Sequence, residues 1–185
     1  MIIEETKLSG VFTMVPKVYM DARGSVMETY REDIFHSEIG VSPNFVQENQ
    51  SVSVKGVLRG LHTQHTNPQG KLVRVVDGSI FDVVVDIRKE SPTFGQWVGI
   101  ELSSTNHKQL WIPEGFAHGF VVLSESAICH YKLTDYYYPD NQITIAWNDS
   151  TINVGWPKDI IPILSDKDIH NSITLNDYVH TSFNQ

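Results

Sequence analysis

The sequence contains a single cysteine, Cys129, among its 185 residues. One thiol cannot form a disulfide within the chain, so the disulfide framework typical of small secreted domains is excluded. Long hydrophobic runs are also absent. The first segment, MIIEETKLSG, carries acidic residues early, and no apolar run approaches the roughly 20 residues of a membrane span. We therefore expect a cytoplasmic protein that has no membrane partner.

Basic residues are fewer than acidic ones, with 14 lysines and arginines against 22 aspartates and glutamates and a formal net charge of -8. This balance repels polyphosphate and argues against nucleic acid as a partner. Hydrophobic residues make up 41% and charged residues 19%, which is ordinary globular usage. We expect one domain over residues 1–185, with a core at about 12–168 and a C-terminal tail at 169–185.

Short segments rich in β-branched and aromatic residues recur along the chain, and turn residues separate them. Predicted strands cover 11–15, 45–47, 72–76, 80–87, 97–102, 109–112, 119–123, 127–133 and 143–147. Only residues 30–39 and a short segment capped by Ser165 have helical character. Many short strands with few peripheral helices predict an all-β fold, a sandwich or barrel of the jelly-roll type.

Two local features refine the prediction. Asp77-Gly78 is a strong type I′ turn signal, so we expect 72–76 and 79–87 to pair as an antiparallel hairpin. Within the second strand one face is wholly apolar, whereas the other carries Asp82 and Asp86 between Ile and Val residues. A mixed inner face suits a polar cavity.

The stretch GVLRGLHTQHTNPQGK, residues 56–71, concentrates charged and titratable side chains, and WIPEGFAHGF adds His118. His62, His65 and His118 could supply three imidazoles to a divalent ion, as in jelly-roll metal sites of the cupin type. The spacing His62-Thr-Gln-His65 departs from the cupin motif, in which two histidines stand one residue apart. Lys71 would also repel a cation. A metal-free site is therefore the favoured interpretation.

Without a metal, His62 is a natural general base near neutral pH. Lys71 would stabilise developing negative charge, and Tyr131 could be the matching acid. Each of the three residues alone is also compatible with a structural role. Together they indicate a functional site, because a strand run that holds arginine, histidine and lysine must bury several charges, which is costly without partners or ligands.

These residues lie in a series of linked motifs: FVQENQS, GVLRGLH, QGKLVRV, FDVVVDIRKESPTFG, QLWIPEGFAHGF, YKLTDYY and ILSDKD. From about Phe12 to Asp168 the chain closely resembles the dTDP-4-dehydrorhamnose 3,5-epimerases, metal-free sugar-nucleotide epimerases of the cupin superfamily. Several motifs in the same order make this resemblance more specific than any single signature.

The resemblance implies that dTDP-4-dehydro-6-deoxy-D-glucose is converted to dTDP-4-dehydro-L-rhamnose by inversion at C3 and C5. It implies His62 as the base, held by Asp168, with Tyr131 as the acid and Lys71 near the enolate oxygen. No cofactor or metal is implied. The implied substrate contacts are Arg23, Glu28, Gln47, Asn49, Arg59, His118, Tyr137, Gln142 and Lys167. Tyr137 would stack on the thymine, and a homodimer that exchanges N-terminal strands is expected.

Two departures stand out. Gln142 occupies a position where the family usually carries glutamate. Glutamine keeps an acceptor oxygen but lacks the negative charge of glutamate. Simple alternation places Arg59 and His62 on opposite faces of a strand, so a bulge or strand end is required near Gly60. The alternatives are a single-position epimerase acting at C3 or C5, a metal-dependent cupin oxygenase or isomerase, and a sugar-nucleotide binder without activity.

Overall fold

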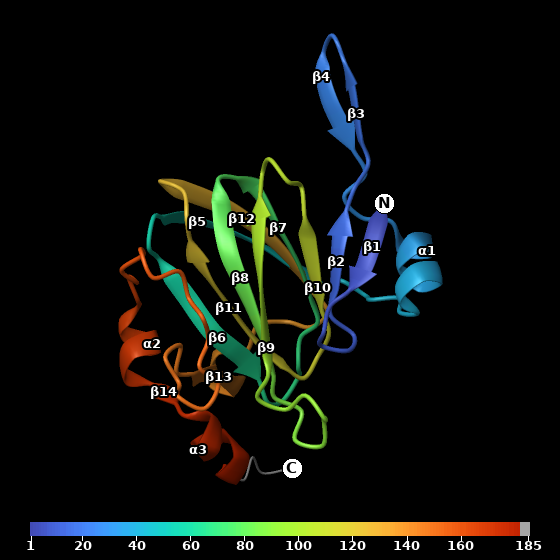
Figure 1. Cartoon of the computed structure of the whole chain (residues 1–185). Coiled ribbons are helices and arrows are strands. Elements are labelled where there is room, and N and C mark those ends of the chain that lie inside the picture. The colour runs from blue at the N-terminus through green and yellow to red at the C-terminus, as the bar shows by residue number, and fades with distance from the viewer. Residues whose placement is uncertain (182–185) are drawn as a thin grey trace.

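A computed structural model describes residues 1–181, and in it two six-stranded sheets face each other (Figure 1). The first sheet contains, in spatial order, β1 (Ile2–Glu5), β2 (Phe12–Val15), β10 (Gln109–Ile112), β7 (Lys71–Asp77), β12 (Ser126–Leu133) and β5 (Gln47–Val54). The second sheet contains β14 (Ser172–Ile173), β13 (Gln142–Ile145), β6 (Leu58–Gln64), β11 (Phe116–Val122), β8 (Ser79–Asp86) and β9 (Trp97–Ser103). This arrangement confirms the predicted all-β class.

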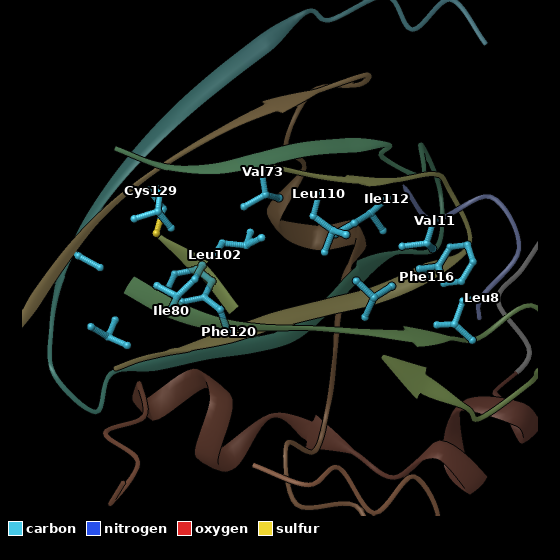
Figure 2. Close-up of a cluster of buried hydrophobic side chains, with 14 residues drawn as sticks. Leu8, Val11, Val73, Ile80, Leu102, Leu110, Ile112, Phe116, Phe120 and Cys129 are labelled. Carbon is cyan, nitrogen blue, oxygen red and sulfur yellow. The ribbon is translucent and has the colours of Figure 1, made fainter. Parts of the chain in front are cut away.

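The main hydrophobic core fills the space between the sheets. Figure 2 shows Val73 and Leu110 from the first sheet meeting Ile80 and Phe120 from the second. Strand β8 has two different faces, as predicted: Ile80, Val84 and Asp82 alternate with apolar residues that pack in a separate cluster on the outer side of the second sheet. The mixed face of β8 is therefore the inner one.

The predicted hairpin at Asp77-Gly78 is wrong. Strand β7 pairs with β10 and β12 in the first sheet, whereas β8 pairs with β11 and β9 in the second. The turn instead carries the chain from one sheet to the other. Gly78 has φ +76°, and a Cβ there would lie 2.1 Å from the Ser126 carbonyl oxygen. Both strands carry apolar side chains that need the same core, so they face each other across it instead of pairing edge to edge.

Of the predicted strands, 72–76, 97–102, 109–112 and 127–133 fall within observed ones, and 11–15, 80–87, 119–123 and 143–147 overlap them but run one or two residues past an end. The segment 45–47 is wrong, because β5 begins at Gln47 and continues to Val54. The hairpin of β3 (Val18–Asp21) and β4 (Gly24–Met27) was not predicted. It is a separate two-stranded sheet that projects from the sandwich (Figure 1).

The helical segments are short. Residues 30–39 contain α1 (Glu32–Ile34) and the π-helical η1 (Phe35–Ile39), as predicted. Ser165 caps α2 (Asp166–His170), also as predicted, and η2 (Pro139–Asn141) is a 3-10 turn. The expected tail holds β14 and α3 (Leu175–His180), and its residues 182–185 lie outside the described part. Within residues 1–181, no helix has the length and apolar character required to cross a bilayer.

Candidate active site

A cavity of about 550 Å³ opens between the two sheets on the side of β5, β12 and β6. Its volume falls within the range of small-molecule sites. The first sheet contributes Lys71 and Tyr131 to the lining, and the second sheet contributes His62 and His118. Helix α2 adds Asp168, which lies far along the chain from the other four.

A β-bulge allows β6 to direct two functional side chains into this cavity. Arg59 is opposite Phe120 and His62 is opposite His118, so Gly60 and Leu61 together face one residue of β11. The bulge required by the sequence argument is therefore present, and both Arg59 and His62 line the cavity. The peptide bond between Gly60 and Leu61 is cis.

Strands β6 and β11 can approach closely at the bulge because Gly60 and Gly119 meet there. A Cβ on Gly60 would lie 2.5 Å from the Cα of Gly119, and the φ of Gly60 is +130°. Side chains larger than hydrogen would collide with backbone there. The glycines therefore set the position of the bulge.

His62 and Asp168 form a hydrogen-bonded pair, with 2.6 Å between Nε2 and Oδ1. Asp168 is only 5% exposed, and its backbone N–H donates to the Ser165 Oγ at 3.2 Å, so the helix cap fixes its position. Burial lowers the pKa of His62, and the charges of Lys71 and His118 add to this, while the bond to Asp168 opposes it. A lowered pKa keeps the imidazole neutral, which is the form that accepts a proton.

The pKa of Asp168 is also below its usual value. Burial acts to raise it, but the hydrogen bond and the charge of His62 outweigh burial, with Ser165 and Lys167 contributing. Asp168 is therefore a carboxylate that can orient His62 and stabilise positive charge on its ring.

Lys71 begins β7, and its ammonium group lies in the cavity. Burial lowers the pKa of Lys71 to about 8, and the negative charge of Asp82 partly opposes this shift. The Lys71 Nζ lies 3.5 Å from the backbone oxygen of His62, so it is close to the His62–Asp168 pair. A buried cation next to a base can stabilise an anion that the base generates.

Tyr131 and His118 complete the polar lining. Tyr131 is on β12, directly opposite Val73 of β7, and its ring packs against the central core. His118 Nε2 lies 2.9 and 3.0 Å from the two carboxylate oxygens of Asp82, which has no exposed surface.

The predicted substrate contacts divide into two groups. Those that line the cavity are Asn49, Arg59, His118, Tyr137, Gln142 and Lys167. Gln47 lies behind them: its amide donates to the Asn49 Oδ1 at 3.0 Å and its oxygen accepts from the Tyr137 N–H at 3.0 Å. Arg23 and Glu28 are not among the lining residues, because they belong to the projecting β3–β4 hairpin and the residue that follows it.

The structure adds residues that sequence reasoning missed. Gln64 lines the cavity, and its side chain bonds to the Tyr136 oxygen and the Tyr138 N–H, so it holds the loop that carries Tyr137. Gln69 and Leu164 also line the cavity. The alternation that places His62 inward on β6 places Gln64 inward too, so a strand-face argument could have found it.

The three histidines considered for a metal do not converge. His65 is exposed and lies outside the cavity lining, and the Nε2 atoms of His62 and His118 each contact an aspartate. Across residues 1–181 no three His, Cys, Asp or Glu side chains are grouped to hold a metal ion.

The sandwich and its cavity define a jelly-roll protein whose candidate site holds a buried histidine–aspartate pair and a buried lysine. The family model described as dTDP-4-dehydrorhamnose 3,5-epimerase matches residues 5–176, and the chain belongs to this family of isomerases. It is 55% identical to the dTDP-4-dehydrorhamnose 3,5-epimerase of Salmonella typhimurium over 91% of this chain and 92% of the relative.

Solved structures agree with this assignment. A dTDP-6-deoxy-D-glucose-3,5-epimerase from Legionella pneumophila, in complex with dTDP-4-keto-L-rhamnose, superposes with a TM-score of 0.91 at 47% identity, covering 95% of this chain and 93% of that one. A 3'-monoepimerase from Streptomyces bikiniensis, in complex with dTDP-quinovose, gives a TM-score of 0.89 at 31% identity, covering 95% and 88%.

Proposed function

We propose that the protein inverts C3 and C5 of dTDP-4-dehydro-6-deoxy-D-glucose to give dTDP-4-dehydro-L-rhamnose. One observation carries the proposal: His62 and Tyr131 line one cavity from opposite sheets. A sugar ring held between the sheets would present one face to the base and the other to the acid. Removing a proton from one face and returning it to the other inverts a carbon.

The C4 ketone makes the protons on both neighbouring carbons acidic, so the reaction requires a base and a way to stabilise an enolate. His62 is the proposed base, because its lowered pKa leaves it neutral and Asp168 stabilises the imidazolium that forms. Lys71 is the proposed partner of the enolate oxygen, since a buried ammonium acts strongly where water is excluded.

Tyr131 is the proposed acid that returns the proton. Its position on the first sheet, across the cavity from β6, supports this role. Gln142, which replaces the usual glutamate, also lines the cavity and would give the sugar a neutral contact.

The nucleotide part of the substrate has suitable partners. Arg59 can bind a diphosphate through parallel charge-assisted bonds, and Lys167 adds a second cation at the cavity wall. We propose that the thymine stacks on Tyr137, whose hydroxyl lies 3.5 Å from the Lys167 Nζ. The Legionella relative, solved with dTDP-4-keto-L-rhamnose, supports a dTDP-sugar as substrate.

We also propose a homodimer in which N-terminal strands are exchanged. The β3–β4 hairpin exposes Met20 (80%) and Val26 (69%), and the side chain of Arg23 near its tip is 90% exposed. Such a hairpin has no core of its own and is suited to packing on a second copy. Arg23 and Glu28 would then reach the partner's cavity. A lone buried thiol, Cys129, agrees with a cytoplasmic location.

Complementation tests the shared site. His62→Ala and Arg23→Ala subunits, differently tagged and co-expressed, should form mixed dimers with one intact site, in which the Arg23→Ala subunit supplies His62 and its partner supplies Arg23. Activity recovered above that of either variant alone is the expected result. No recovery from purified mixed dimers would overturn the exchange.

The reaction itself is tested in deuterated water with dTDP-4-keto-6-deoxy-glucose, by following C3 and C5 with proton NMR. Deuterium at both carbons is expected, together with formation of the rhamnose-configured product. Deuterium at one carbon would select a single-position epimerase, the second candidate, which the likeness to the Streptomyces 3'-monoepimerase favours. No exchange at either carbon would refute the proposal. His62→Ala should abolish exchange, whereas His65→Ala, outside the cavity, should not.

A further inference from the structure

The site contains a second histidine–aspartate pair, in which His118 is a predicted substrate contact and Asp82 has no role in the proposed reaction. His118 Nε2 bonds to both oxygens of Asp82, at 2.9 and 3.0 Å, and Asp82 is completely buried on β8. His118 and His62 are direct partners in the antiparallel register of β11 and β6. Both imidazoles therefore sit side by side, and each uses its Nε2 for a carboxylate.

Asp82 is well placed to act on Lys71. The groups that line the cavity with Lys71 are Arg59 and His62 on β6, His118 on β11, Tyr131 on β12 and Asp168 on α2, and the thiol of Cys129 on β12 is buried in the core. Asp168 is bonded directly to His62. Asp82 is the group whose negative charge favours the Lys71 ammonium, and the same charge helps burial to raise the pKa of the Cys129 thiol to about 12.

We propose that Asp82 is a positioning residue that keeps Lys71 in its ammonium form inside the cavity and holds the His118 ring with Nε2–H toward the carboxylate. The His118 Nδ1 is then the nitrogen available to a substrate hydroxyl. This inference rests on the proposed function, because it assigns Asp82 the task of maintaining the positive charge that meets the enolate.

The role has a consequence for pH. Only the ammonium form of Lys71 can neutralise an enolate oxygen, so activity declines as pH rises through the pKa of about 8. Replacing Asp82 by a neutral side chain removes the interaction that raises this pKa, so Lys71 loses its proton at lower pH. The alkaline limb of the kcat profile then moves toward acid.

The experiment compares kcat and KM of the wild type and Asp82→Asn between pH 5.5 and 9, with epimerisation followed by NMR. The expected result is an alkaline limb shifted to lower pH, so that activity falls more at pH 8 than at pH 6. Asp86→Asn is the matched control: Asp86 is on the same strand and equally buried, but it bonds to Arg88 and not to His118. The alkaline limb of the kcat profile of Asp86→Asn should stay at the wild-type pH. A uniform loss of kcat in Asp82→Asn, with an unshifted limb, would overturn the proposal.

A second measurement needs neither a variant of Asp82 nor turnover. Nitrogen-15 NMR of the wild type should show neutral His118 protonated on Nε2, and carbon-13 NMR should show Lys71, assigned through Lys71→Met, titrating near pH 8. Protonation of His118 on Nδ1, or a Lys71 that loses its proton well below pH 8, would contradict the inference. An inactive wild type that shows the expected signals would refute the proposed reaction and leave the assignment of Asp82 supported.

Discussion

Replacing Asp168 by asparagine tests the link between the helix cap and the base. Asp168→Asn keeps the size of the side chain and the backbone N–H that donates to Ser165, but removes the charge 2.6 Å from His62. As His62 takes a proton it becomes an imidazolium, and a charge-assisted hydrogen bond to it is worth about 1.5–3 kcal/mol. Losing that stabilisation in the transition state corresponds to a fall in kcat of about 10- to 150-fold.

The sign of the pH effect follows from the same contact. Asp168 raises the pKa of His62 against burial, so its removal lowers that pKa further. The acid limb of the kcat profile should move to lower pH, while activity on the plateau falls because His62 is a weaker base. KM should change less than kcat, because the lost interaction strengthens only when the proton moves.

The assay is steady-state epimerisation over a range of pH, with deuterium incorporation read in parallel. Asp166→Asn is the control, because Asp166 lies in the same helix but is exposed and outside the cavity lining. It should retain wild-type kcat and pH profile. An Asp168→Asn enzyme with unchanged kcat and acid limb would refute the reasoning that Asp168 acts through His62.

Three further predictions concern the acid, the bulge and the cap. Tyr131→Phe should lower product formation by roughly 100-fold, the scale of one acid–base group, while deuterium exchange of the substrate persists; equal loss of both would contradict its role as the acid. Gly60→Ala should lower the free energy of unfolding by at least about 2 kcal/mol in urea titrations, because its Cβ would meet Gly119. Gly24→Ala, at φ +123° with open space around it, isolates the backbone contribution and should cost less. Ser165→Ala should remove about 1 kcal/mol of cap stability and lower kcat, with faster hydrogen exchange in α2; unchanged exchange would contradict the cap's role.

Much of the site could be read from the sequence, because its chemistry is concentrated in a few motifs. Because regular alternation of side chains places Arg59 and His62 on opposite faces, the sequence predicted an irregularity near Gly60, and the bulge lies there. The Ser165 cap was also predictable from local chemistry. Asp82 was noted only as a polar residue on a mixed strand face, since nothing local indicates which histidine or lysine lies opposite it.

The errors have physical reasons. The Asp77-Gly78 signal describes a tight reversal, but it does not say whether the two strands join one sheet or two, because that depends on burying both apolar faces. Residues 48–54 of β5 were missed, because Glu48 and Gln50 stand on an exposed face, where strand propensity is weakly expressed. Arg23 and Glu28 are no such error: they do not line the cavity of a single subunit, and their contact with substrate stays a prediction for the dimer.

The bulge in β6 changes which residues of the strand point into the cavity. Before Gly60 the strand points one set of residues inward, and after Leu61 it points the other set, so Arg59 and His62 share a cavity although three positions separate them. Deleting Gly60 or Leu61 would leave Arg59 and His62 two positions apart, the spacing at which a regular strand points two side chains to the same face. A search for proteins with this site should therefore require the three-residue spacing with glycine after the arginine, because a regular strand with that spacing and no bulge would turn the two side chains to opposite faces.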